Sequence, residues 1–63
     1  MKNLGKNIKD KRKAASMTQA ELANIVGVNQ SMIALYENGY KTPGVAVLSR
    51  IAKTLNVKID ELL

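Results

Sequence analysis

Apolar residues recur along the chain at steps of three and four, the spacing that places side chains on one face of an α-helix. The pattern predicts helices over Leu4 to Ala15, Thr18 to Val26, Gln30 to Asn38, Val45 to Leu55 and Ile59 to Leu63. The chain shows no strand pattern. The sequence therefore predicts an all-α fold of five short helices.

The apolar faces of these helices are expected to meet in one core. On the second helix, Ile25 is expected to share the inward face with Leu22 and Val26. On the first helix, Ala15 is expected to share it with Ile8. The predicted core comprises Ile8, Met17, Leu22, Ala23, Val26, Val28, Ile33, Leu48, Ile51, Ala52, Leu55, Val57, Ile59 and Leu62.

Local signals mark the ends of the second and third helices. Thr18 and Glu21 form a T-x-x-E capping box, in which each side chain accepts a hydrogen bond from the other residue's backbone N–H. Gly27 can adopt the positive φ that ends a helix, and Asn29 can cap the next one. A further stop follows at Asn38-Gly39. Two short helices joined by so tight a turn predict a helix-turn-helix.

A longer series of residues agrees with this interpretation: Thr18-Gln19-Ala20-Glu21-Leu22-Ala23, Val26-Gly27-Val28, Ile33, Glu37-Asn38-Gly39, Pro43, Leu48, Ile51-Ala52, Leu55 and Ile59-Asp60-Glu61-Leu62. Over about residues 4 to 63 the sequence resembles the phage-repressor and Cro-like helix-turn-helix family, also called the Xre family. The resemblance implies one compact lambda-repressor-like domain over residues 1–63, with its motif at about residues 18–38. Ser16 stands where the family commonly has glycine, so a positive φ there would cost on the order of 1 kcal/mol. Asn56 is expected to end the fourth helix in the left-handed conformation.

Composition narrows the chemistry that the chain can perform. It has no cysteine and no histidine, so disulfides, thiolate nucleophiles, imidazole bases and the usual zinc sites are excluded. We therefore expect no enzyme, no metal and no cofactor. No apolar run approaches the roughly 18 residues of a membrane span, and no signal peptide is indicated. The chain is expected to act in the cytoplasm, as a bacterial or phage-encoded protein working at the nucleoid.

The distribution of charge along the chain is uneven. Its net charge is +5, and most of its basic residues fall before residue 16. Residues 16–40 contain two acids and no base, so the third predicted helix has positive flanks. Scattered lysines can simply keep a small protein soluble, and charge alone leaves that interpretation open. The resemblance favours a polyanionic partner instead.

The resemblance implies that the helix over Gln30 to Asn38 enters the major groove of double-stranded DNA, where base edges are distinguishable. The candidate base-reading residues are Asn29, Gln30, Ser31, Ala34 and Leu35. Gln30 can exchange two hydrogen bonds with adenine, worth roughly 1–3 kcal/mol of discrimination. Asn29 could equally cap the helix, and Leu35 could equally fill the core.

The candidate phosphate-binding residues are Thr18, Gln19, Asn38, Tyr40, Lys41 and Thr42. Gln19 lies at the start of the second helix, where free N–H groups and the helix dipole favour an anion. The residues after the third helix are expected to anchor the other side of the same groove. The resemblance also implies a structural ion pair between Arg12 and Glu37, with two exposed, unpaired charges as the alternative.

These features predict a sequence-specific transcriptional regulator that acts as a repressor. Because one helix reads only a few base pairs, a homodimer on an inverted repeat is expected, at least on DNA. The alternative is a protein-interaction module that uses the same surface, which the absence of Arg and Lys within the third helix favours.

Overall fold

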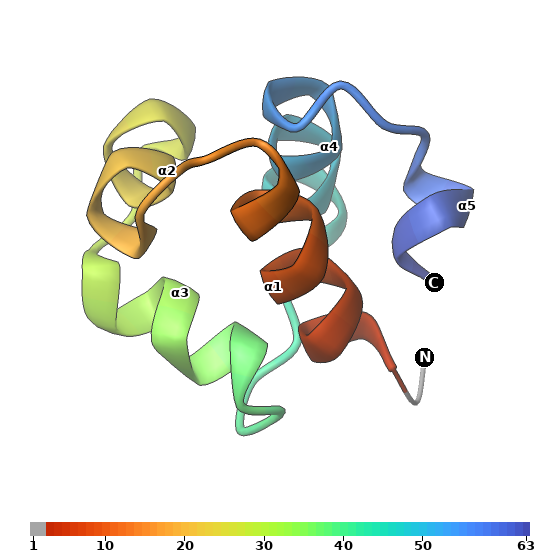
Figure 1. Ribbon diagram of the computed structural model, residues 1–63. Helices are drawn as coiled ribbons and strands as arrows, with labels where there is room; N and C mark the ends of the chain where they lie inside the picture. Colours follow the sequence, from red (N-terminus) through yellow and green to blue (C-terminus); the bar gives the residue numbers. More distant parts are fainter. Residues whose placement is uncertain (1–2) are drawn as a thin grey trace.

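Five helices follow one another along the chain: α1 (Leu4–Ala14), α2 (Gln19–Val26), α3 (Gln30–Glu37), α4 (Val45–Thr54) and α5 (Ile59–Leu62) (Figure 1). The structure, a computed structural model, describes residues 3–63, and Lys2 of the basic N-terminal segment lies outside them. Every helix end falls within one residue of its predicted position. The predicted all-α architecture is confirmed, and the described residues contain no strand.

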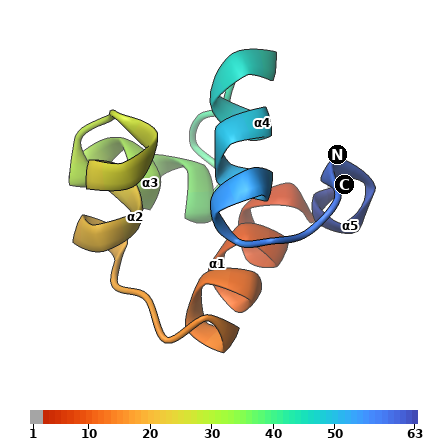
Figure 2. The same cartoon turned by 90° about the horizontal axis from the view of Figure 1, so that it is seen from above.

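α4 separates the helix-turn-helix from the C-terminal helix. α2 and α3 lie on one side of α4, and α5 lies on the other (Figure 2). α1 contacts both α3 and α5, while α4 contacts both α2 and α5. α1 therefore packs against the second helix of the motif, α3, and α4 packs against the first, α2. No helix within residues 3–63 has the length and apolarity needed to cross a bilayer.

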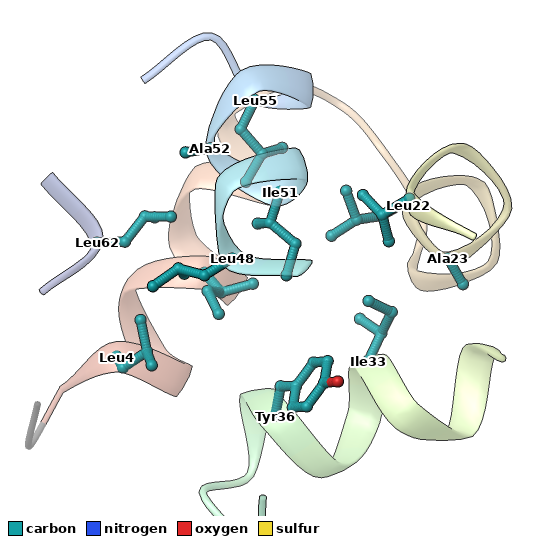
Figure 3. Close-up of a cluster of buried hydrophobic side chains, with 12 residues drawn as sticks. Leu4, Leu22, Ala23, Ile33, Tyr36, Leu48, Ile51, Ala52, Leu55 and Leu62 are labelled. Carbon is teal, nitrogen blue, oxygen red and sulfur yellow. The ribbon is translucent and has the colours of Figure 1, made fainter. Parts of the chain in front are cut away.

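One side chain from each helix is fully enclosed at the centre of the fold. These are Ile8, Leu22, Ile33, Ile51 and Leu62, each with 0% of its surface exposed. Figure 3 shows Leu22, Ile33, Ile51 and Leu62 at the centre of the cluster. Burying one such side chain stabilises the fold by about 1.5–3 kcal/mol. The predicted core is confirmed, although Met17, Val28, Val57 and Ile59 are only partly buried against it. Leu4 and Tyr36 complete it.

Two residues that were expected on the inward faces of their helices are exposed instead. Ala15 is exposed because α1 ends at Ala14 and the next residue faces no other helix. Ile25 is 57% exposed, although its neighbours Leu22 and Val26 are buried. Each residue advances about 100° around a helix, so the inward face of α2 leaves Ile25 at its margin.

Within residues 3–63, four residues adopt the left-handed conformation where helices or turns end. Gly27 and Gly39 both have φ of 81°, as the sequence predicts for glycine stops. Asn56 has φ of 58°, which confirms its predicted role after α4. Ser16 has φ of 56°, so the chain turns between α1 and α2 through a residue type that this conformation disfavours.

Replacing Ser16 by glycine is therefore expected to raise the free energy of unfolding by about 1 kcal/mol. Urea denaturation followed by circular dichroism measures the change. Asn56→Gly is the matched control, and its gain should be smaller because asparagine tolerates the left-handed region better than serine does. Equal gains for the two variants would mean that Ser16 carries no particular backbone strain.

Candidate nucleic-acid interface

Local hydrogen bonds fix both ends of α2, the first helix of the helix-turn-helix. Thr18 Oγ1 accepts a hydrogen bond from Glu21 N at 3.0 Å, and Thr18 N donates to Glu21 Oε1 at 2.8 Å. This confirms the predicted capping box, and the bonds from Thr18, chiefly that from its backbone, hold the pKa of Glu21 below its usual range. At the other end of α2, Gly27 N donates to Ala23 O at 2.9 Å. The chain is then free to start α3 after Asn29.

α3 presents two chemically different faces. Ile33, Tyr36 and Glu37 are buried against the rest of the fold. Gln30 and Ser31 are exposed on the opposite side, and Ala34 and Leu35 are half-buried between the two faces. The only charged residue of α3, Glu37, is on the buried side. The helix therefore offers solvent a polar, uncharged surface.

The structure bears on the alternative roles of Asn29, as a helix cap or a base-reading residue, and of Leu35, as a core residue or a base contact. Asn29 occupies the N-cap position of α3 with extended backbone angles, but its side chain makes no capping hydrogen bond. Its amide is exposed, so capping does not occupy it. Leu35 is neither a buried core residue nor fully exposed. Its role as a core filler is thus partial, and one side of it faces solvent.

Arg12 and Glu37 form a buried, two-point ion pair between α1 and α3. Arg12 Nε donates to Glu37 Oε2 at 2.6 Å, and Nη2 donates to Oε1 at 3.1 Å. The side chains are 9% and 1% exposed. The hydrogen bond to Glu37 raises the pKa of Arg12 above its already high usual value. The third guanidinium nitrogen donates to Met17 O at 2.8 Å, so Arg12 also holds the segment that leads into α2.

Gln19 joins this network, which its predicted phosphate role did not anticipate. Its Nε2 donates to Glu37 Oε1 at 3.0 Å. The Glu37 carboxylate at the end of α3 is therefore bonded both to Arg12 of α1 and to Gln19 at the start of α2. A second hydrogen on the same nitrogen and the first backbone N–H groups of α2 have no partner within the helix. Those donors remain able to bind a phosphate, and the phosphate contact of Gln19 stays a prediction.

The exposed segment after α3 folds back onto the end of that helix. The backbone N–H groups of Tyr40 and Lys41 both donate to Leu35 O, at 2.9 and 3.2 Å. The side chains of Asn38, Tyr40, Lys41 and Thr42 are all exposed.

The assignment of Asn38 and the residues after it to the other side of the groove stays a prediction. The buried side chain of Glu37 reaches Gln19 at the start of α2, whereas Asn38, the next residue, is exposed.

Two residues that the sequence analysis did not single out also position the motif. Arg50 Nε of α4 donates to Val26 O at 3.1 Å, at the C-terminal end of α2, where a positive charge is favourable. Asn7 Nδ2 of α1 donates to Leu62 O at 3.0 Å and so holds α5. Neither bond has a local sequence signal, because each one joins residues that are brought together only by folding.

The outer surface of α1 is positively charged beside the motif. Lys6 Nζ lies 2.8 Å from Asp10 Oδ2, and this pair is exposed. The hydrogen bond lowers the pKa of Asp10 and raises that of Lys6, and the nearby Lys13 and Lys9 lower the pKa of Asp10 further. Three lysines thus surround a single carboxylate, and their excess charge faces solvent.

The helix-turn-helix family model matches residues 8–62 of the chain. Among curated proteins, the ImmF control region 10 kDa protein of Bacillus phage phi105 is 39% identical over 61 residues, which are 97% of this chain and 68% of that protein. Among solved structures, the P22 c2 repressor in complex with a synthetic operator is 32% identical. The likeness covers 95% of this chain and 91% of that one, with a TM-score of 0.91.

The same fold also occurs as part of a larger enzyme. Hydroxypropylphosphonic acid epoxidase from S. wedmorenis is 31% identical, with a TM-score of 0.88, over 95% of this chain but only 32% of its own. The likeness is thus confined to about a third of that enzyme. The match of the family model over most of the chain, together with the identity to phage regulators, leads to one assignment. The chain belongs to the phage-repressor and Cro-like helix-turn-helix family.

Proposed function

We propose that this protein is a sequence-specific, double-stranded DNA-binding transcriptional regulator that acts as a repressor by binding, without catalysis. The observation that carries the proposal is the exposed polar face of α3, which the buried Arg12–Glu37 pair holds at one end. An α-helix fits the major groove, where each base pair presents its own pattern of donors and acceptors. The likeness to an operator-bound repressor supports the same conclusion.

The base contacts are assigned to the exposed side of α3 and its first residues. Gln30 carries both a donor and an acceptor, so it can form a two-point contact with adenine. Asn29 and Ser31 are exposed beside it and can bond base edges. Ala34 and Leu35, one turn further along, offer apolar contact to a thymine methyl group.

The phosphate contacts are assigned to the two segments on either side of α3. Thr18 and Gln19 lie at the start of α2, where backbone N–H groups of the first turn have no partner within the helix and can meet a phosphate. Asn38 is exposed directly after α3. Tyr40, Lys41 and Thr42 follow in the exposed segment. Contacts of this kind set the register of the protein on the duplex but carry no direct sequence information.

A single α3 reads too few base pairs to define a site in a genome. We therefore propose a homodimer, at least on DNA, whose two copies of α3 read the halves of an inverted repeat about one helical turn apart. Such a protein would act in the cytoplasm of a bacterial cell, on bacterial or phage DNA.

Selection from a pool of random duplexes, with sequencing of the bound fraction, tests this function directly. Fluorescence-anisotropy titrations at several salt concentrations should accompany it. We expect an enriched inverted repeat and binding that weakens steeply as salt rises, because phosphate contacts release counterions. No enrichment together with no binding at low salt would reject the DNA-binding function. It would instead favour a protein partner at the uncharged face of α3.

Two substitutions distinguish the base-reading role assigned to Gln30 from the phosphate-binding role assigned to Lys41. Gln30→Ala is expected to weaken binding to the enriched duplex by roughly 1–3 kcal/mol and to relax selection at one base position. Lys41→Ala should instead weaken binding to all duplexes alike and reduce the salt slope by about one unit. Titration of both variants against the enriched and the random duplexes measures these effects. Equal loss on every duplex for Gln30→Ala would remove Gln30 from base reading.

A further inference from the structure

A glycine in the first turn of α1 allows an unusually close approach to the reading helix. A Cβ atom placed on Gly5 would lie 2.3 Å from Tyr36 O and 2.8 Å from Glu37 O. Both atoms belong to the backbone at the end of α3, so no side chain can rotate away from them. Approaches under 3.0 Å are essentially never seen for real Cβ atoms. Position 5 therefore accepts glycine alone, because any other residue type would place a Cβ atom against this backbone.

Local preference does not explain this glycine. Glycine in a helix is less stable than alanine by roughly 0.5–1 kcal/mol, and α1 would form better without it. Its benefit lies in the contact itself, since a Cα hydrogen directed at a carbonyl oxygen is a recurring interaction where helices cross. The lower helix stability that glycine causes in α1 is thus offset by the close backbone contact between α1 and α3.

The contact lies at the end of α3, beside the hydrogen bonds that hold this helix to α1 and α2. Glu37, the last residue of α3, accepts hydrogen bonds from Arg12 and Gln19, and Asn38 follows it. A methyl group on Gly5 would have to move the end of α3 by about 1 Å to restore ordinary contact. That movement would shift α3 relative to the start of α2, and base and phosphate contacts would no longer fit one duplex together.

We propose that Gly5 is a positioning residue, which sets the distance between α1 and the end of α3 and thereby the sequence selectivity of the protein. This inference rests on the DNA-binding function proposed above. Non-specific attraction to DNA depends on charge at long range and is insensitive to a small displacement. Gly5 should therefore matter for the ratio of specific to non-specific affinity, which a residue needed only for stability would leave unchanged.

The test is Gly5→Ala in the 63-residue chain, measured well below its melting temperature, where circular dichroism shows it to be folded. Its affinity is compared for the enriched duplex and for a random duplex. We expect specific affinity to fall about tenfold, the equivalent of one lost base contact, while random-duplex affinity stays the same. Amide chemical shifts should move at the end of α3 more than elsewhere.

Two control variants isolate position from stability. Gly44→Ala adds a methyl group where nothing lies within 4 Å, and it should leave the affinity ratio unchanged. Leu62→Val lowers stability on the far side of α4, and it too should preserve the ratio (Figure 2). The Gly5 variant is also prepared with Ser16→Gly to offset its instability.

The outcomes distinguish the two proposals. If the wild-type protein enriches no duplex, the DNA-binding function itself fails. If wild-type binds selectively and folded Gly5→Ala keeps the same affinity ratio, the positioning role of Gly5 is rejected. It is also rejected if Gly5→Ala fails to fold in both backgrounds, because the contact would then determine stability rather than the position of α3.

Discussion

Glu37→Ala is expected to lower the free energy of unfolding by about 3–5 kcal/mol, because it removes one partner of a buried ion pair. The guanidinium of Arg12 would be left without its carboxylate, and Gln19 would lose its hydrogen-bond acceptor. Domains of this size have a total stability of only about 3–9 kcal/mol. The variant should therefore be largely unfolded at physiological temperature, as thermal unfolding followed by circular dichroism would show.

Two further variants identify the cause of that loss. Removing both charges with Arg12→Met and Glu37→Leu together should recover much of the stability, because no charge is then stranded. If the double variant is as unstable as the single one, the unpaired guanidinium is not responsible. Lys6→Ala breaks the exposed pair with Asp10 and should have little effect, since solvent screens that interaction.

Ile33→Ala is expected to cost about 2–5 kcal/mol, because it opens a cavity behind the reading helix. The Ile33 side chain is 0% exposed and lies in the central core with Leu22 and Ile51 (Figure 3). Urea denaturation of the purified variant measures the loss. Ile25→Ala is the matched control, because the same side chain is 57% exposed there. Its stability should change by less than about 0.5 kcal/mol.

The same experiment separates the two faces of α3. Gln30→Ala, on the exposed side, should leave the unfolding transition unchanged while it weakens selective DNA binding. Similar destabilisation by Ile33→Ala and Gln30→Ala would contradict the division of this helix into a packing face and a reading face.

The parts of the fold that could be predicted from sequence are those set by local chemistry. The Thr18 capping box and the stops at Gly27 and Asn56 each depend on neighbouring residues, so helix ends were predictable to within one residue. Helical spacing identified the core because burial repeats with each turn. The pairing of Arg12 with Glu37, which are far apart in sequence, was expected only from the family resemblance.

What could not be predicted depends on how helices cross. Ile25 and Ala15 have apolar side chains at plausible positions, but no helix covers them. The bond from Gln19 to Glu37 joins two different helices, and local spacing does not define the angle at which those helices cross. The approach of Gly5 to α3 is of the same kind, since it depends on the distance between two backbones.

The uncharged exposed face of α3 has a consequence for how such regulators diversify. Stability depends on the opposite face of the helix, and attraction to DNA depends on the charged flanks. Substitutions at Gln30 and Ser31 would therefore change which operator is preferred without altering folding or the non-specific attraction to DNA. After gene duplication, two copies could acquire different operators through a few such changes and then control separate genes in one cell without cross-repression.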